Sequence, residues 1–247
     1  MKKIFNWQVL LALILVTLSF SFYMLDYILF GQLKDIIFYG IIDLAFLFLS
    51  GLIVMLFLNR LLEYREKQSL LKKLNMVIGT FFSEVGTDLL KQCAGYENNK
   101  KELYSGLIIS GSWNEKDFLT AKNMITVPEI QIKCNEKGLE KLKVFLVERR
   151  PFLLSLLANP NLLEHEAFTD LLWAVFHLTE ELEHRSTFNG LPAGDYKHLF
   201  GDINRAYTRL ILQWLDYMAH LKRAYPYLFS LALRRNPFDK QADVIIK

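Results

Sequence analysis

The chain has 247 residues, of which 52% are hydrophobic and 22% charged, and its mean hydropathy is positive (+0.19). This combination fits a short membrane section joined to a globular section, and it excludes a transporter made mostly of spanning helices. The formal net charge of +3 is too small to indicate nucleic acid binding, so we expect no nucleic acid partner. With 12 Gly and 6 Pro, the composition favours a helical protein over a disordered one.

Two apolar runs near the N-terminus are long enough to cross a membrane. Residues 4–25 carry no charge, and residues 36–58 carry one. Because a spanning helix needs about 20 apolar residues, we expect spans at about 5–25 and 36–58, forming a transmembrane hairpin over residues 1–59. A signal peptide is the alternative for the first run, but that run is too long and no small-residue cleavage site follows it.

Basic residues lie outside the hairpin loop. Lys2 and Lys3 precede the first run and Arg60, Arg65 and Lys67 follow the second, whereas the loop 26–35 holds one Lys and two Asp. The positive-inside rule therefore predicts that both termini are cytoplasmic.

Asp43 is the ionisable residue within the second run. An intramembrane carboxylate is a candidate for pairing or proton transfer. Its position about two turns from the outer end also allows contact with water or headgroups. Both interpretations stay open.

Residues 60–95 are predicted to form a juxtamembrane amphipathic helix, because apolar residues recur three and four apart. Small residues at Gly79, Ser83 and Gly86 share one face, where another backbone could approach closely or the helix could bend. The apolar positions suggest a seam for a possible homodimer. Its members are Leu70, Leu74, Phe81 and Val85.

Residues 96–247 are expected to form a cytoplasmic helical domain. Capping and periodicity predict helices from Ser112 to about 123, from 137 to a break at Pro151, over 151–158, 162–184, 202–225 and 227–235. The stretch 189–194 is predicted to be a connector, and 129–133 a short extended piece. The glycines at 106 and 111 lack the lysine of a phosphate-binding loop, which excludes a nucleotide site there.

A histidine and carboxylate cluster is the sharpest chemical signal in the sequence. His177, Glu181 and His184 are candidate metal ligands, for Zn or Fe, because Glu181-x-x-His184 has the spacing used in di-metal helical bundles. Asp216 and His220 form a second pair, four residues apart.

Helical periodicity, however, places His177 and His184 opposite the apolar stripe of their helix, where a solvated polar face is expected. Coverage of this face by another helix would bury the cluster and favour a metal site. Trp173 lies near the same face, either as part of a protein-binding patch or beneath such a helix.

Other templates do not match. The two cysteines, Cys93 and Cys134, lie in no nucleophile motif and are expected to be reduced thiols. No Gly-x-Ser-x-Gly motif is present. Basic residues in the C-terminal part, such as Arg234 and Arg235, either contact anionic lipid or form an ordinary charged surface.

The stretches Asn75–Gly86, Tyr225–Ala232 and Arg234–Phe238 resemble parts of uncharacterised prokaryotic membrane proteins with two N-terminal transmembrane helices and a cytoplasmic helical domain. The resemblance covers most of the chain and implies a setting in the cell inner (plasma) membrane of a prokaryote. It implies no activity.

We therefore predict an all-α protein, with a transmembrane hairpin followed by a cytoplasmic helical bundle. Its expected role is that of an interaction or signalling-type module with the lipid bilayer and an unknown protein as partners, and with no catalytic site or cofactor. The alternative is a metal-dependent helical enzyme or metal sensor that uses the His177/Glu181/His184 cluster.

Overall fold

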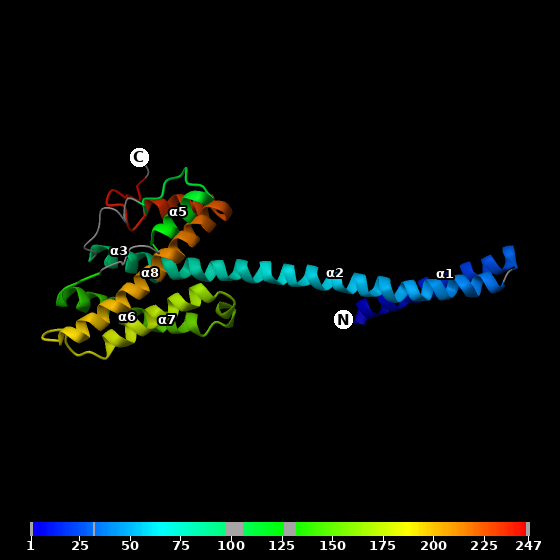
Figure 1. Cartoon of the computed structure of the whole chain (residues 1–247), viewed down its shortest axis with the longest axis horizontal. Helices are drawn as coiled ribbons and strands as arrows, with labels where there is room; N and C mark the ends of the chain where they lie inside the picture. Colours follow the sequence, from blue (N-terminus) through cyan, green and yellow to red (C-terminus); the bar gives the residue numbers. More distant parts are fainter. Residues whose placement is uncertain (1, 32, 97–105, 126–131, 246–247) are drawn as a thin grey trace. The chain divides into compact units, whose positions relative to one another are not determined.

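The computed structural model of the protein describes residues 2–31, 33–96, 106–125 and 132–245. Every regular element in these ranges is helical (Figure 1), which confirms the all-α prediction. The chain divides into two compact units, Met1–Lys67 and Gln68–Lys247. The boundary lies inside one continuous helix, α2 (Leu33–Phe81), and so divides the segment 60–95 between the two units.

The first unit consists of α1 (Lys2–Phe30) and the N-terminal part of α2. The two helices run in opposite directions (Figure 1), and Gly31 ends α1 with a φ of 64°, in the left-handed region that favours glycine. Each helix contains an apolar window long enough to cross a membrane, and no residue of either window is buried. Asp43 is exposed as well.

The second unit begins with the C-terminal part of α2, followed by a π-helix, η1 (Phe82–Gly86), and α3 (Thr87–Gly95). Leu74, Phe81 and Val85 are buried in the core of this unit. The seam proposed for a homodimer is therefore filled by the chain's own helices at these three positions, and only Leu70 keeps partial exposure. Homodimerisation of the chain stays a prediction.

The remaining helices form the helical domain around α8, which packs against α7, α5, α9, α3 and η1, while α6 packs against α7 (Figure 1). Their bounds are α5 (Glu115–Ile125), α6 (Glu136–Leu157), the 3-10 helix η2 (Pro160–Glu164), α7 (Glu166–Glu183), α8 (Ala193–Ala224) and α9 (Pro226–Arg234).

Two of these helices differ from the predicted ones at their ends. α8 begins at Ala193 instead of near Asp202, so only the last two residues of the stretch 189–194, predicted as a connector, enter the helix. α6 continues through Pro151 without a break. The proline removes one backbone donor, but Leu146, Leu153 and Leu156 on either side of it are buried, and this packing holds the helix together.

Helix caps explain two further differences. α7 begins at Glu166 rather than Leu162, because the His165 Nδ1 accepts a hydrogen bond from the Phe168 N–H at 3.1 Å. α5 is capped by Asn114, whose side chain accepts from the Lys116 N–H at 2.8 Å, and not by Ser112. The predicted extended piece at 129–133 lies mostly outside the described residues.

Aromatic rings fill the space where the end of α2 meets the other helices. Phe81 contacts Phe82 and Phe168 edge to face, with ring centroids 5.3 and 5.4 Å apart, and Phe82 stacks on Tyr217 at 5.1 Å. Tyr217 also lies 3.5 Å from where a Cβ on Gly79 would be. Gly79 therefore makes room for an aromatic side chain, and not for a second backbone, whereas Ser83 is exposed.

Both cysteines are buried free thiols. Burial raises the pKa of Cys93 far above its ordinary value and raises the pKa of Cys134 to about 11. The thiolate form is therefore scarce at neutral pH, and neither side chain is suited to act as a nucleophile.

Gly86 and Gly201 form a matched pair for testing this core. A Cβ on Gly86 would lie 2.6 Å from the Phe82 ring and 2.9 Å from the Phe81 ring, both of them buried. We expect Gly86→Ala to lower the free energy of unfolding by about 1–3 kcal/mol, because the rings cannot move away. Thermal unfolding of the full chain in detergent micelles, followed by circular dichroism, measures this change.

The control is Gly201→Ala in α8, where a Cβ meets nothing within 4 Å. Alanine there should leave stability unchanged or raise it by up to about 1 kcal/mol, since glycine is a poor helix former. Equal melting temperatures for the two variants would contradict the packing at Gly86.

Candidate functional site

The candidate site lies between α7 and α8, the two helices that contribute one imidazole each. On α7, the apolar stripe containing Phe168, Leu171 and Val175 faces the core, which leaves His177 at the margin of the packed face. On α8, His198 and Asp202 are four residues apart and therefore lie on the same face of the helix. Packing of α7 against α8 brings the three side chains together.

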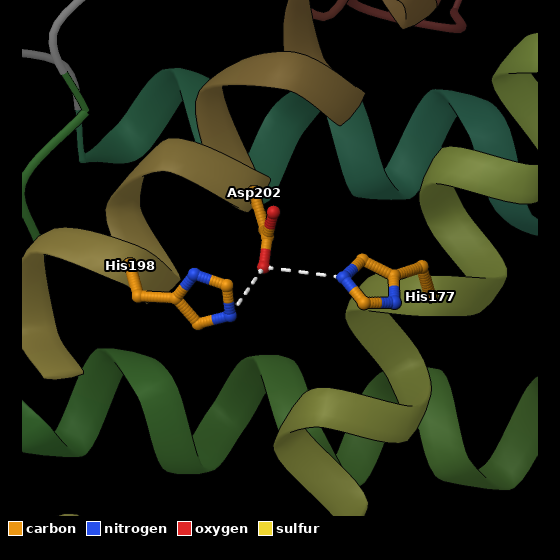
Figure 2. A group of neighbouring side chains, drawn as sticks. All are labelled: His177, His198 and Asp202. Atoms are coloured by element: carbon orange, nitrogen blue, oxygen red, sulfur yellow. Dashed lines mark ion pairs between the residues drawn. The ribbon is translucent and has the colours of Figure 1, made fainter.

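Figure 2 shows both imidazoles directed at one carboxylate oxygen. The Asp202 Oδ2 lies 3.5 Å from the His177 Nε2 and 3.3 Å from the His198 Nε2. One potential ligand atom from each of the three residues falls within 4.8 Å of the others. The imidazoles are half-exposed, at 44% and 52%, whereas Asp202 is 2% exposed.

The two oxygens of Asp202 have different surroundings. Oδ1 forms an ion pair with the Arg205 guanidinium, whose Nη1 lies 3.0 Å away. Oδ2 is buried and has no hydrogen-bond partner among the described residues. A buried carboxylate oxygen normally has a donor or a cation, so the Oδ2 between two imidazoles marks a position where a positive ligand would fit.

Glu181 borders the site and connects it to an ion-pair group. Its Oε2 lies 3.5 Å from the His198 Nε2, and its Oε1 lies 3.9 Å from the His177 Nε2. The Arg185 guanidinium pairs with Glu181 at 2.8 Å and with Asp195 at 2.6 Å. The hydrogen bond from Arg185 lowers the pKa of Glu181, and the same guanidinium lowers the pKa of Asp195.

Of the three candidate ligands predicted from the sequence, His177 belongs to this group and Glu181 borders it. His184 lies outside: it ends α7, exposed, with its Nδ1 2.8 Å from the Glu180 carbonyl oxygen. The structure brings His198 and Asp202 to His177 instead. Neither was a candidate, because the helix that carries them was predicted to begin near Asp202, whereas α8 begins at Ala193.

The second predicted pair does not converge. Asp216 forms an ion pair with Lys122 of α5 at 2.7 Å. His220 packs against the ring of Tyr225, and burial, followed by the nearby Arg223 charge, lowers its pKa.

Trp173 remains 57% exposed on α7, so no helix of the described chain covers it. Its ring contacts Phe176 edge to face, and Arg150 lies over the Phe176 ring while pairing with Glu183 at 3.1 Å. Of the two interpretations of Trp173, the covered one is wrong, and the protein-binding patch stays a prediction.

Comparison with known proteins shows one family over both units. Residues 2–62 match the model for the N-terminal helical domain of MJ1433, and residues 70–234 match the model for the C-terminal helical domain of the uncharacterized protein MJ1433. The uncharacterized protein MJ1433 of Methanocaldococcus jannaschii is 43% identical over 240 residues, which cover 97% of this chain and 96% of that protein. No solved structure matches the chain. The resemblance to an uncharacterised helical family is thereby confirmed.

The ion pair between Arg185 and Asp195 predicts how the stability of the protein depends on pH. Because Arg185 lowers the pKa of Asp195 in the folded protein, the pair contributes stability that is fully present above the unfolded pKa of about 3.9 and is lost as the pH falls through the lowered folded value. We expect Asp195→Asn to lower the free energy of unfolding at pH 7 by about 1–2 kcal/mol, since a bidentate, partly buried pair is lost.

Thermal unfolding of the variant and the natural chain at pH 7 and pH 3 measures this effect, and the difference between them should shrink at pH 3. The control is Glu148→Gln, which removes a partner of Arg149 that is 73% exposed and should change stability little. A difference that is independent of pH would contradict the ion-pair explanation.

Proposed function

The chain belongs to the family of the uncharacterised protein MJ1433. Because no activity is assigned to this family by its description, we propose a function from the chain's own residues. We propose that the protein is a membrane-anchored, non-catalytic interaction module. α1 and the N-terminal part of α2 would cross the membrane as a hairpin and hold the helical domain, Gln68–Lys247, at the cytoplasmic face.

The observation that carries the proposal is the complete exposure of the two apolar windows. Large side chains along both helices are exposed, including Phe20 at 71% and Phe48 at 72%. Exposed apolar surface costs about 25 cal/mol per Å² in water, so helices of this length and composition require an apolar surrounding. A lipid bilayer provides one for an isolated pair of helices.

The charges on either side of the hairpin support the orientation. Lys2 and Lys3 would stay with Arg60, Arg65 and Lys67 on the cytoplasmic side, and the short turn at Gly31 would lie outside. Both termini would then be cytoplasmic.

A signalling-type role is supported by the continuity of α2. This helix extends without interruption from the apolar window to Phe81, and its last turns are buried in the domain core through Leu74 and Ile78. We propose that a rotation or displacement of the apolar part would be passed along this helix to the helical domain. The partner of the module is proposed to be a protein that contacts the exposed Trp173.

Topology is the direct test of the anchor. We expect a cysteine introduced by Lys34→Cys to react from outside intact cells with a membrane-impermeant maleimide, and one introduced by Lys240→Cys to react only after permeabilisation. Cys93 and Cys134 are buried, so they contribute little background labelling. A chain that remains in the soluble fraction after lysis, or labelling of Lys240→Cys in intact cells, would overturn the anchor or its orientation.

The protein-partner part has its own test. A photo-crosslinking amino acid placed at Trp173 should give a discrete crosslinked species in membranes, because exposed tryptophans are frequent at the centres of interfaces. The matched control is the same amino acid at Val144, which is 60% exposed on α6. Equal crosslinking at the two positions would argue against a specific patch around Trp173.

A further inference from the structure

We propose that His177, His198 and Asp202 bind a divalent first-row transition metal ion, with Glu181 beside it as a fourth ligand. This inference goes beyond the membrane-anchored role. All four residues lie within Gln68–Lys247, so the metal site and the anchor can fail independently.

The spacing of the ligand atoms is the first argument. Two atoms that bind the same ion at 2.0–2.1 Å in tetrahedral geometry are about 3.3–3.4 Å apart. The distances from the Asp202 Oδ2 to the two Nε2 atoms are 3.3 and 3.5 Å, and that from the Glu181 Oε2 to the His198 Nε2 is 3.5 Å. The distances from Oδ2 to both imidazoles are therefore close to those that coordination requires, and the ligand atoms of the two imidazoles lie within 4.8 Å of each other.

The alternative is a direct hydrogen-bonded cluster, which the same distances disfavour. N–H···O hydrogen bonds in proteins measure 2.7–3.2 Å, and both imidazole nitrogens lie farther than this from Oδ2. The Oδ2 is buried, in a residue 2% exposed, without a hydrogen-bond donor among the described residues. An ion between the two imidazoles would provide the missing partner.

The ligand types select the class of ion. Two imidazoles and one or two carboxylates suit Zn²⁺ and Fe²⁺, whereas Ca²⁺ and Mg²⁺ prefer oxygen ligands throughout. The half-exposure of His177 and His198 leaves the ion accessible to solvent or to a further ligand, unlike the closed site of a structural zinc.

Residues around the ligands hold them in position. Arg205 pairs with the Asp202 Oδ1, which leaves Oδ2 for the ion. Arg185 pairs with the Glu181 Oε2, so this oxygen would be shared between the guanidinium and the ion. Such outer contacts orient carboxylate ligands and are part of many metal sites. His198 and Asp202 are fixed relative to each other by the backbone of α8, so only the packing of α7 on α8 has to be maintained for the site to persist.

Metal titration of the full chain tests the proposal. The protein is purified in detergent with a tag that contains no histidine, stripped with a chelator, and titrated with Zn²⁺ by calorimetry and with Co²⁺ by visible absorption. We expect one Zn²⁺ per chain and Co²⁺ bands typical of low coordination number with nitrogen and oxygen ligands.

Substitutions of single residues distinguish metal ligands from residues that do not bind the ion. His198→Ala and His177→Ala should each weaken Zn²⁺ binding by about 100-fold or more, since each removes an expected ligand. Both positions are half-exposed, so the variants should fold, and their circular dichroism spectra verify this. Asp202→Asn should have the same effect on binding and should also remove the Co²⁺ bands.

His184→Ala is the matched control, because this imidazole is exposed on the same helix but lies outside the cluster. It should bind Zn²⁺ as the natural chain does. Absence of stoichiometric binding by the natural chain, or an equal loss in His184→Ala and His177→Ala, would overturn the proposal.

Discussion

The packing of α7 against α8 is the contact on which the helical domain and its candidate site both depend. Each helix buries an apolar stripe in the common core, and the stripe on α8 includes Leu199, Ile203 and Leu210. Burial of such side chains contributes about 1.5–3 kcal/mol each, which is far more than any of the polar contacts at the edge of this interface. The polar cluster is therefore positioned by the core, and its side chains meet because the apolar stripes fit together.

At Asp202, burial in the packed core conflicts with the need of a charged carboxylate for ion-pair or hydrogen-bond partners. The core side of α8 buries its carboxylate, and the ordinary solution for a buried charge is complete pairing. In this structure Oδ1 forms an ion pair with Arg205. Oδ2 faces two imidazoles at distances too long for good hydrogen bonds. A buried oxygen without a hydrogen-bond donor costs free energy, and the cation proposed to bind between the imidazoles would offset that cost.

Most of the architecture follows from local patterns in the sequence. Two uncharged or nearly uncharged runs predicted α1 and the first part of α2, and apolar periodicity predicted α7 and the body of α8. The start of α8 was missed because Gly194 and Gly201 are poor helix formers, and the buried Leu199 between them outweighs that preference only once α7 is in place. Pro151 was predicted as a break for the same reason. The prediction used the poor helix propensity of proline and did not include tertiary packing.

The candidate site was likewise predicted only in part. His177 and Glu181 were found because they lie on one helix at a recognisable spacing. His198 and Asp202 have equally regular spacing, but their helix was predicted to begin near Asp202, and nothing in a single sequence shows which face of α8 meets α7. The apolar periodicity of Leu74, Phe81 and Val85 indicated a face that is buried, and the structure buries it in the chain's own core. A pattern of this kind does not show whether the partner is another chain or another part of the same one, and homodimerisation stays a prediction.

The π-helix η1 joins α2 to α3. The backbone N–H and the hydroxyl of Thr87 both donate to the Phe82 carbonyl oxygen, so one extra residue is contained in that turn. Removing a single residue there would return the segment to ordinary α-helix, and α3 would keep nearly its present rotation relative to the last turns of α2. A deletion in this turn is therefore expected to disturb the core less than a deletion within α3, which would turn the residues after it by about 100°.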